Sequence, residues 1–160
     1  MQRPIVEFVQ DKAGDWIALL NCGHRQHVRH QPPIAERAWV TTSEGRVAQL
    51  GQPLACPQCD RFEWPQALLA YQRTPEFTAE TIPAGLRKDH STKQGVWARI
   101  MILEGALHYQ VDALGASFEL TPELPGIVVP EVQHHVAPIG AVRFYVEFYR
   151  GNVQHSNFNR

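Results

Sequence analysis

The sequence has little that would bind a charged polymer or a membrane. Its 15 Lys and Arg residues nearly balance 16 Asp and Glu residues, which leaves a formal net charge of −1. This balance argues against nucleic acid as a partner. No apolar run approaches the ~20 residues of a transmembrane helix, and the N-terminal residues are charged where a signal peptide would be apolar. We therefore expect a cytoplasmic protein that binds no membrane.

Cysteine is also scarce, and its placement is informative. All three cysteines lie in two clusters, Cys22-Gly23-His24 and Cys56-Pro57-Gln58-Cys59. An odd number of cysteines in a reducing compartment argues against structural disulfides. Three thiolates and one imidazole make a complete tetrahedral zinc set. We therefore predict a structural zinc bound by Cys22, His24, Cys56 and Cys59.

Alternatives to this ligand set remain open. His27 and His30 compete with His24 for the fourth position, because the segment HRQHVRH places three imidazoles at intervals of three. A thioredoxin-like redox pair at Cys56 and Cys59 is a further alternative, although the βαβ pattern of such a motif is missing. Because four protein ligands leave no open position, the zinc is expected to fold the domain and not to catalyse.

The first part of the chain is expected to be a small unit with short elements. Residues 4–20 predict a hairpin, and residues 39–42 predict a short strand that leads into one or two helical turns. The linker to the next part is expected at residues 62–71. The imidazole-rich edge around Arg25 and His27 is either a solvated loop or a binding edge for an anion or a protein.

The second part carries the pattern of an all-β domain. Apolar segments punctuated by Pro and Gly predict short strands separated by turns, one of the turns at Leu103-Glu104-Gly105. The expected strands are 95–105, 107–111, 116–120, 126–129 and 142–149. No GxGxxG loop follows a strand, which argues against a cofactor-binding domain of that type. The segment after Arg150 is polar and is expected to be a tail.

Imidazoles and carboxylates gather in this second part. The residues are His90, Lys93, Glu131, His134, His135 and Glu147. Positions beside strand ends converge on the mouth of a small barrel, where they can share a metal or a ligand. The last strand alternates an apolar set with a polar one that includes Tyr145 and Glu147. This polar set faces either solvent or a binding cavity.

Two family resemblances follow from these blocks. The segment from GDWIALLNCGHRQHVRHQPP to CPQCD resembles an uncharacterised bacterial Cys/His-rich domain. The blocks TPEFTAETIPAGLRKDHSTKQGVWARIMILEGALHYQV and PGIVVPEVQHHV resemble the cupin-type domain at the N-terminus of tellurite-resistance protein B. The second resemblance implies a double-stranded β-helix barrel and a homodimer. It also implies a metal or ligand site at His90 and His134.

We therefore expect a mainly β protein, with a zinc-ribbon-like unit at 1–64, a cupin-like barrel at 68–150 and a tail at 151–160. The barrel metal is expected to be Zn, Fe, Ni or Mn, held by His90, Glu131 and His134. Lys93, His135, Tyr145 and Glu147 are the expected ligand-binding residues.

The functional hypothesis is binding of a small molecule or oxyanion in a bacterial stress response. The alternative is a non-catalytic sensor or adaptor whose zinc ribbon binds a protein partner. Whether the barrel catalyses a reaction is left open by the sequence.

Overall fold

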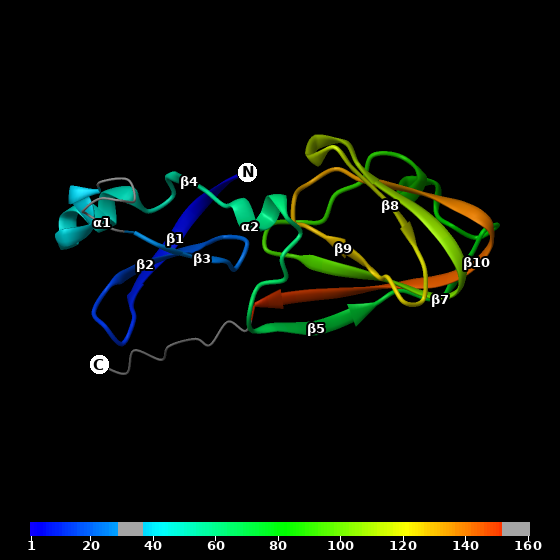
Figure 1. Cartoon of the computed structure of the whole chain (residues 1–160), viewed down its shortest axis with the longest axis horizontal. Helices are drawn as coiled ribbons and strands as arrows, with labels where there is room; N and C mark the ends of the chain where they lie inside the picture. The colour runs from blue at the N-terminus through cyan, green and yellow to red at the C-terminus, as the bar shows by residue number, and fades with distance from the viewer. Residues whose placement is uncertain (29–36, 152–160) are drawn as a thin grey trace. The chain divides into compact units, whose positions relative to one another are not determined.

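The computed structural model describes residues 1–28 and 37–151 (Figure 1). His30 and the expected tail from residue 152 onward lie outside the described residues. The chain divides into two compact units, Met1–Gln66 and Ala67–Arg160. The boundary falls within the stretch where the sequence predicted a linker.

The first unit is organised by a four-stranded antiparallel sheet in the order β3-β2-β1-β4. Its strands are β1 (Gln2–Gln10), β2 (Trp16–Leu20), β3 (Arg25–His27) and β4 (Pro53–Ala55). The predicted first hairpin is confirmed. Its turn is held by the Asp11 carboxylate, because Oδ1 accepts the backbone N–H groups of Ala13 and Asp15, both at 2.9 Å.

The described part of the first unit also contains short helical segments. They are η1 (Ala38–Thr41), α1 (Ser43–Gln49) and α2 (Pro57–Asp60). The strand predicted at residues 39–42 is wrong, because this segment forms η1. Thr42 caps α1 by accepting the Gly45 N–H at 3.0 Å, and a Cβ at Gly45 would lie 2.1 Å from the Trp39 carbonyl oxygen. This close turn overrides the β propensity of Val40 and Thr41.

The second unit is built on one six-stranded sheet. Its main order is β5-β10-β7-β8, while β6 pairs with β10 and β9 pairs with β7. The strands are β5 (Leu68–Arg73), β6 (Phe77–Thr78), β7 (Trp97–Val111), β8 (Ala116–Leu120), β9 (Gly126–Val128) and β10 (His135–Gly151), and the 3-10 helices are η2 (Ala84–Arg87) and η3 (Asp112–Leu114). The mainly β fold is therefore confirmed, and closure into a cupin barrel stays a prediction.

The paired strands β7 and β10 dominate the second unit. The turn predicted at Leu103-Glu104-Gly105 is wrong, because β7 runs through this position as one strand. Gly105 has a φ of +79°, and a Cβ there would lie 2.0 Å from the Ala141 carbonyl oxygen. The ladder shifts register between Ile139 and Val142, opposite this glycine. The Leu103-Glu104-Gly105 segment therefore marks a bend inside β7 and not the end of that strand.

We expect Gly105→Ala to destabilise the second unit by roughly 2–5 kcal/mol, because it adds left-handed backbone strain and an unavoidable contact with Ala141. Gly115→Ala is the matched control. Gly115 also has a positive φ, +59°, but nothing lies within 4 Å of a Cβ there, so a loss of only about 1–2 kcal/mol is expected. Urea unfolding of both variants measures the difference, and equal losses would contradict the close-approach argument.

Candidate metal centre and ligand pocket

The two metal-ligand clusters of the first unit are both held in tight turns. Cys22 and His24 lie in the turn between β2 and β3, where Gly23 has a φ of +91°. The turn is closed by a 2.8 Å bond from the Gly23 N–H to the Leu20 carbonyl. The second cluster opens α2, with Cys56 at its N-cap and Cys59 inside it. Glycine is suited to the first turn because it adopts a positive φ without strain.

These turns bring all four predicted ligands together in a buried cluster. The exposed fraction is 1% for Cys22, 3% for His24 and 0% for Cys56 and Cys59. Their candidate ligand atoms all lie within 4.8 Å of one another. His27, the described rival ligand, lies outside this group and contacts Asp11 at 3.2 Å. The prediction that His24 joins the three cysteines is therefore the one that the geometry supports.

The distances within the cluster match the edges of a zinc tetrahedron. His24 Nδ1 lies 3.5 Å from Cys22 Sγ, 3.3 Å from Cys56 Sγ and 3.6 Å from Cys59 Sγ. The Sγ atoms of Cys22 and Cys56 are 3.9 Å apart. Ligands bound to one zinc at ordinary bond lengths lie about 3.5–3.8 Å from each other, whereas disulfide sulfurs lie about 2.05 Å apart. The side chains therefore fit a shared ion.

The outer nitrogen of His24 is held by the backbone. Nε2 lies 2.9 Å from the Glu63 carbonyl oxygen, which can only accept, so Nε2 donates and Nδ1 is the nitrogen that faces the three sulfurs and would bind a metal ion. The chain returns toward His24 because Phe62 adopts a φ of +55° just after α2. Such an outer hydrogen bond is typical of zinc-bound histidine, because it fixes the tautomer and the ring orientation.

The four buried side chains of the cluster change one another's pKa values through hydrogen bonds. Burial lowers the pKa of His24, but its hydrogen bonds with Cys22 and Cys56 outweigh burial and raise that pKa to about 9. Hydrogen bonds with Cys22 and Cys59 hold the pKa of Cys56 well below its usual range. A metal ion would displace the remaining protons, because its ligands must be thiolates and neutral imidazole.

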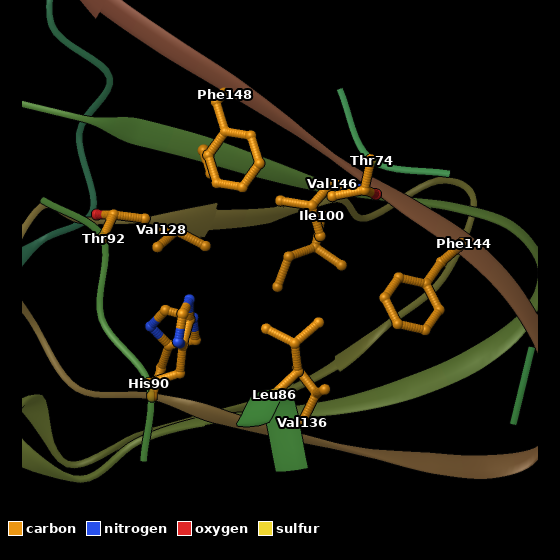
Figure 2. Close-up of a pocket in the computed structure, with 12 residues that line it drawn as sticks. Thr74, Leu86, His90, Thr92, Ile100, Val128, Val136, Phe144, Val146 and Phe148 are labelled. Carbon is orange, nitrogen blue, oxygen red and sulfur yellow. The ribbon is translucent and has the colours of Figure 1, made fainter. Parts of the chain in front are cut away.

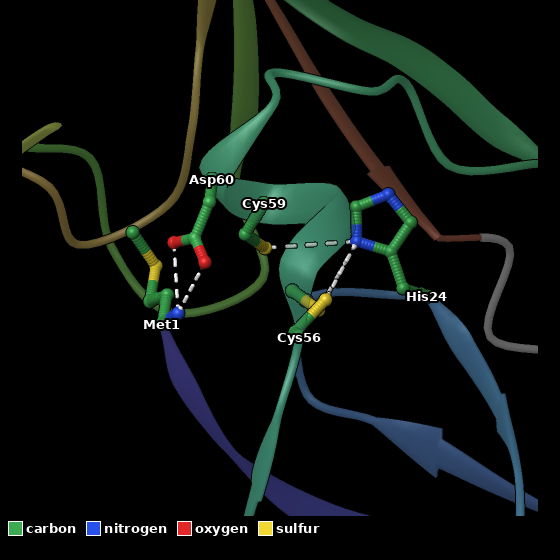
Figure 3. Close-up of polar contacts among 6 residues, drawn as sticks. Met1, His24, Cys56, Cys59 and Asp60 are labelled. Carbon is green, nitrogen blue, oxygen red and sulfur yellow. Dashed lines mark hydrogen bonds and ion pairs between the residues drawn. The ribbon is translucent and has the colours of Figure 1, made fainter.

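The helix that carries Cys56 and Cys59 is also tied to the start of β1 (Figure 3). The Cys56 N–H donates to the Met1 carbonyl at 2.7 Å. The Met1 ammonium group contacts both carboxylate oxygens of Asp60, at 2.8 Å and 2.7 Å. These contacts fix α2 against the sheet, so the second pair of ligands is positioned by the fold as well as by its own turn.

We expect purified protein to hold one metal ion in this cluster. His24→Ala should lose it and lower the melting temperature of the first unit, because a structural metal contributes directly to folding. His27→Ala is the matched control, since it removes a nearby imidazole that lies outside the cluster. Elemental analysis and thermal unfolding are the measurements. Full metal content in His24→Ala would contradict this assignment.

The second unit contains a pocket with mostly apolar walls (Figure 2). Its volume is about 40 Å³, measured as the space open to the centre of a water molecule. The lining residues are Thr74, Leu86, His90, Thr92, Ala98, Ile100, Val128, His134, Val136, Phe144, Val146 and Phe148. Because both halves of β10 contribute, the paired strands β7 and β10 must curl around this space.

Two imidazoles supply ring nitrogens to this apolar pocket. His90 and His134 face each other across an isolated antiparallel bridge, with both N–H···O bonds at 2.8 Å. Their rings are 5.6 Å apart between centroids and nearly perpendicular, at 85°. His134 is only 6% exposed. Burial lowers its pKa, although a hydrogen bond with the Val132 carbonyl opposes that shift.

The structure does not bring the other predicted site residues to this pair of rings. Glu131 is exposed and has a φ of +63°. Among the described residues, no third ligand groups with His90 and His134 as a metal set. Lys93 is exposed and does not line the pocket. The predicted three-residue metal set is therefore reduced to two imidazoles.

The alternation of the last strand explains where Tyr145 and Glu147 lie. The apolar set Phe144, Val146 and Phe148 lines the pocket, so the residues between them point to the opposite face. There the Tyr149 hydroxyl donates to Glu147, and the Arg73 guanidinium lies 3.9 Å from the centre of the Tyr145 ring. Neither Tyr145 nor Glu147 lines the pocket described above.

His135 also turns away from the pocket, in the direction opposite to His134. It lies near two exposed carboxylates, Asp89 and Asp112, and the ligand atoms of the three residues are within 4.8 Å of one another. Its Nδ1 is 3.7 Å from Asp89 Oδ1.

Sequence reasoning missed most of the pocket wall. Thr74, Leu86 and Thr92 come from loops and from η2, where no alternation identifies an inward side. Thr92 had a usable signal, since it lies two residues after His90. The apolar set of the last strand was recognised in the sequence, but not as a wall of the pocket.

The fold and sites define a protein with a buried Cys₃His cluster followed by a β domain that contains an apolar pocket with two histidines. Residues 6–63 match a family described as "Protein of unknown function (DUF3565)". Residues 72–146 match the TehB-like domain family. The chain therefore joins a DUF3565 domain to a TehB-like domain, as the two resemblances predicted.

Solved structures agree with this assignment for the second domain. The chain is 25% identical to TehB from Haemophilus influenzae, with a TM-score of 0.50, over 54% of this chain and 32% of that one. The chain thus spans about a third of that TehB. A protein from E. coli (strain K12) shares the fold at 22% identity and a TM-score of 0.52, over 56% of this chain and 96% of its own. No curated protein matched the chain.

Within residues 1–28 and 37–151, no helix has both the length and the apolar character needed to cross a membrane.

The buried imidazole of His134 predicts a pH dependence of stability. Because burial lowers its pKa from the usual 6.5, the unfolded chain binds a proton at this site as pH falls through 6.5, and the folded chain resists it. The free energy of unfolding should therefore be unaffected by this site above about pH 6.5 and should decrease as the pH falls below that value. Between about pH 7.5 and pH 5.5, protonation of His134 in the unfolded chain should lower the free energy of unfolding by about 1 kcal/mol. The His134→Phe variant should lack this loss.

Urea unfolding at the two pH values measures this difference between the original protein and the variant. The unfolding is followed by the indole N–H NMR signal of the buried Trp97. His108→Phe is the control, because His108 is a half-buried strand residue outside the pocket. An unchanged pH dependence in His134→Phe would contradict the assignment.

Proposed function

We propose that this chain is a small-molecule-binding protein. Its TehB-like domain binds the ligand in the pocket at His90 and His134, and its DUF3565 domain is folded by a structural zinc. The observation that carries the proposal is a pocket with apolar walls into which two imidazoles converge. Ligand sites are typically apolar cavities with a few polar groups that orient the ligand.

The volume of the pocket supports a small ligand. Its 40 Å³ would hold about three water molecules by the same measure of space. Eight of the twelve lining residues are buried, while Thr74, Leu86, His90 and Phe148 are half-buried. A ligand of a few non-hydrogen atoms would fit within it, and a larger one would extend past the half-buried residues.

A second metal is a weaker part of this proposal than the structural zinc. Two imidazoles suit Zn, Fe, Ni or Mn, but they leave most of the coordination positions unfilled. Because no described carboxylate completes the set, such an ion would need ligands from the bound molecule. Co²⁺ titration of the zinc-loaded protein separates these cases, because an ion in the pocket would broaden the NMR signals of His90 and His134.

The biological setting is proposed from the family alone. The TehB-like match supports a role in a bacterial stress response of the tellurite-resistance kind. A homodimer is part of the proposal, and it is supported by β5, which lies at one end of the sheet order and exposes Leu69 by 55% and Tyr71 by 40%. Light scattering on the purified protein measures the oligomeric state.

The pocket is tested by filling it. Ala98 lines the pocket and is fully buried, so Ala98→Ile should occupy the space and abolish the NMR shift changes that 1-butanol causes at His90 and Val136. Ala106→Ile is the matched control, because Ala106 lies on the same strand but outside the pocket. This variant should change the dissociation constant of butanol by less than about twofold.

Overpacking can also unfold a domain. Leu86→Trp, at a half-buried lining position, therefore provides a second block. Butanol binding that survives in folded forms of both variants would refute the pocket as the binding site.

A further inference from the structure

The hydroxyl groups of the pocket are already used by the protein. Thr74 Oγ1 donates to the Pro75 carbonyl at 2.9 Å and accepts the Val146 N–H at 2.9 Å. Thr92 Oγ1 donates to the Val96 carbonyl at 2.6 Å. Because a hydroxyl has one hydrogen, neither threonine can donate to a ligand without breaking an existing bond. A hydrogen bond donated to a ligand must therefore come from one of the two imidazoles, while the threonine oxygens can still accept one.

The hydrogen bond of His134 to the backbone fixes what this ring can offer. Its Nδ1 lies 3.1 Å from the Val132 carbonyl oxygen, and a carbonyl only accepts, so Nδ1 carries the hydrogen. Burial lowers the pKa of His134, which favours the neutral ring. In a neutral imidazole with hydrogen on Nδ1, Nε2 is a hydrogen-bond acceptor. No described residue donates to that nitrogen.

His90 complements this acceptor. Its ring makes no hydrogen bond to any residue that the structure describes, and it lies 5.6 Å from the His134 ring between centroids. Because neither of its nitrogens is committed, His90 can adopt the tautomer that donates into the pocket. A single hydroxyl group could then donate to His134 and accept from His90.

We propose that the ligand is a small uncharged molecule with a mainly apolar body and one hydroxyl, thiol or N–H group, whose hydrogen is donated to His134 Nε2. This inference rests on the proposed function that the pocket binds a ligand. It names the chemical class that the pocket selects, and of the small molecule or oxyanion expected from the sequence it keeps only the small molecule.

The composition of the pocket wall argues against an oxyanion. No Lys or Arg is among the lining residues, and Lys93 is exposed. Moving an anion from water into apolar surroundings is costly unless a charge or several donors compensate for it. The acceptor at His134 would also face the lone pairs of a fully deprotonated oxyanion, so the two would repel each other.

Three probes of similar size test this inference on the full, metal-loaded chain. 1-Butanol donates a hydrogen bond, its isomer diethyl ether only accepts, and butyrate is an anion. Dissociation constants come from NMR shift changes at the pocket residues, at about pH 7.5. Because a hydrogen bond contributes about 1 kcal/mol, we expect butanol to bind about fivefold more tightly than the ether. Butyrate should not bind measurably.

The tautomer of His134 gives a readout that needs no ligand. Long-range ¹H–¹⁵N spectra should show hydrogen on Nδ1 and a bare Nε2. His134→Phe keeps an aromatic ring but removes both nitrogens, Nε2 among them, so it should abolish the preference for butanol over the ether. His108→Phe makes the same change outside the pocket and should preserve that preference.

Each outcome separates the two proposals. If ether or butyrate binds as tightly as butanol at the pocket, or if His134 carries hydrogen on Nε2, the inference about the ligand class is wrong while the pocket remains a binding site. If Zn²⁺ shifts the His90 and His134 signals and butanol does not compete, the pocket takes a metal and not this class of ligand. If none of the three probes causes shifts at pocket residues, the proposed function fails, and the inference fails with it.

Discussion

The antiparallel pairing of β7 with β10 is the constraint on which the TehB-like domain depends. These two strands carry the pairings of β5, β6, β8 and β9 on their outer edges. The ladder runs from His135↔Gln110 to Tyr149↔Trp97 and can curl because of the bend at Gly105 and its register shifts. Curling places residues from both halves of β10 on one pocket. A straight ladder would leave those halves too far apart to share a cavity.

The DUF3565 domain depends on a different constraint, because it is too short to build a large hydrophobic core. A unit of 66 residues buries a modest share of its surface, and a structural metal is one of the devices that stabilise domains below about 70–80 residues. Its ligand set was predictable from the sequence because the chemistry is local. Cys22 and His24 share one turn, Cys56 and Cys59 share another, and only one long-range approach remained to be inferred. That approach is supplied by the pairing of β1 with both β2 and β4.

The pocket was less predictable because it depends on register and on curvature. The sequence placed His90 and His134 at one site through resemblance, and the structure puts them on one bridge. The sequence also placed Tyr145 and Glu147 at this site, but neighbouring residues of a strand point to opposite faces of a sheet, and Phe144, Val146 and Phe148 take the pocket face. Glu131 lies in the turn before β10, where no alternation predicts the direction of a side chain. The Leu103-Glu104-Gly105 segment shows the same limit. Glycine signals an unusual backbone, but only the partner strand decides whether it forms a turn or a bend.

The pocket also has an energetic cost, and this cost bears on its meaning. At about 24 cal/mol per Å³, a void of 40 Å³ lowers stability by about 1 kcal/mol. Burial of the His134 ring adds a loss of stability at low pH, where a packed apolar side chain would add none. Ala98, beside this space, could be a larger apolar residue if stability alone mattered. Local departures from optimal packing are expected at functional sites. The void and the imidazole occur together, so a ligand that fills the void and bonds to Nε2 accounts for both departures at once.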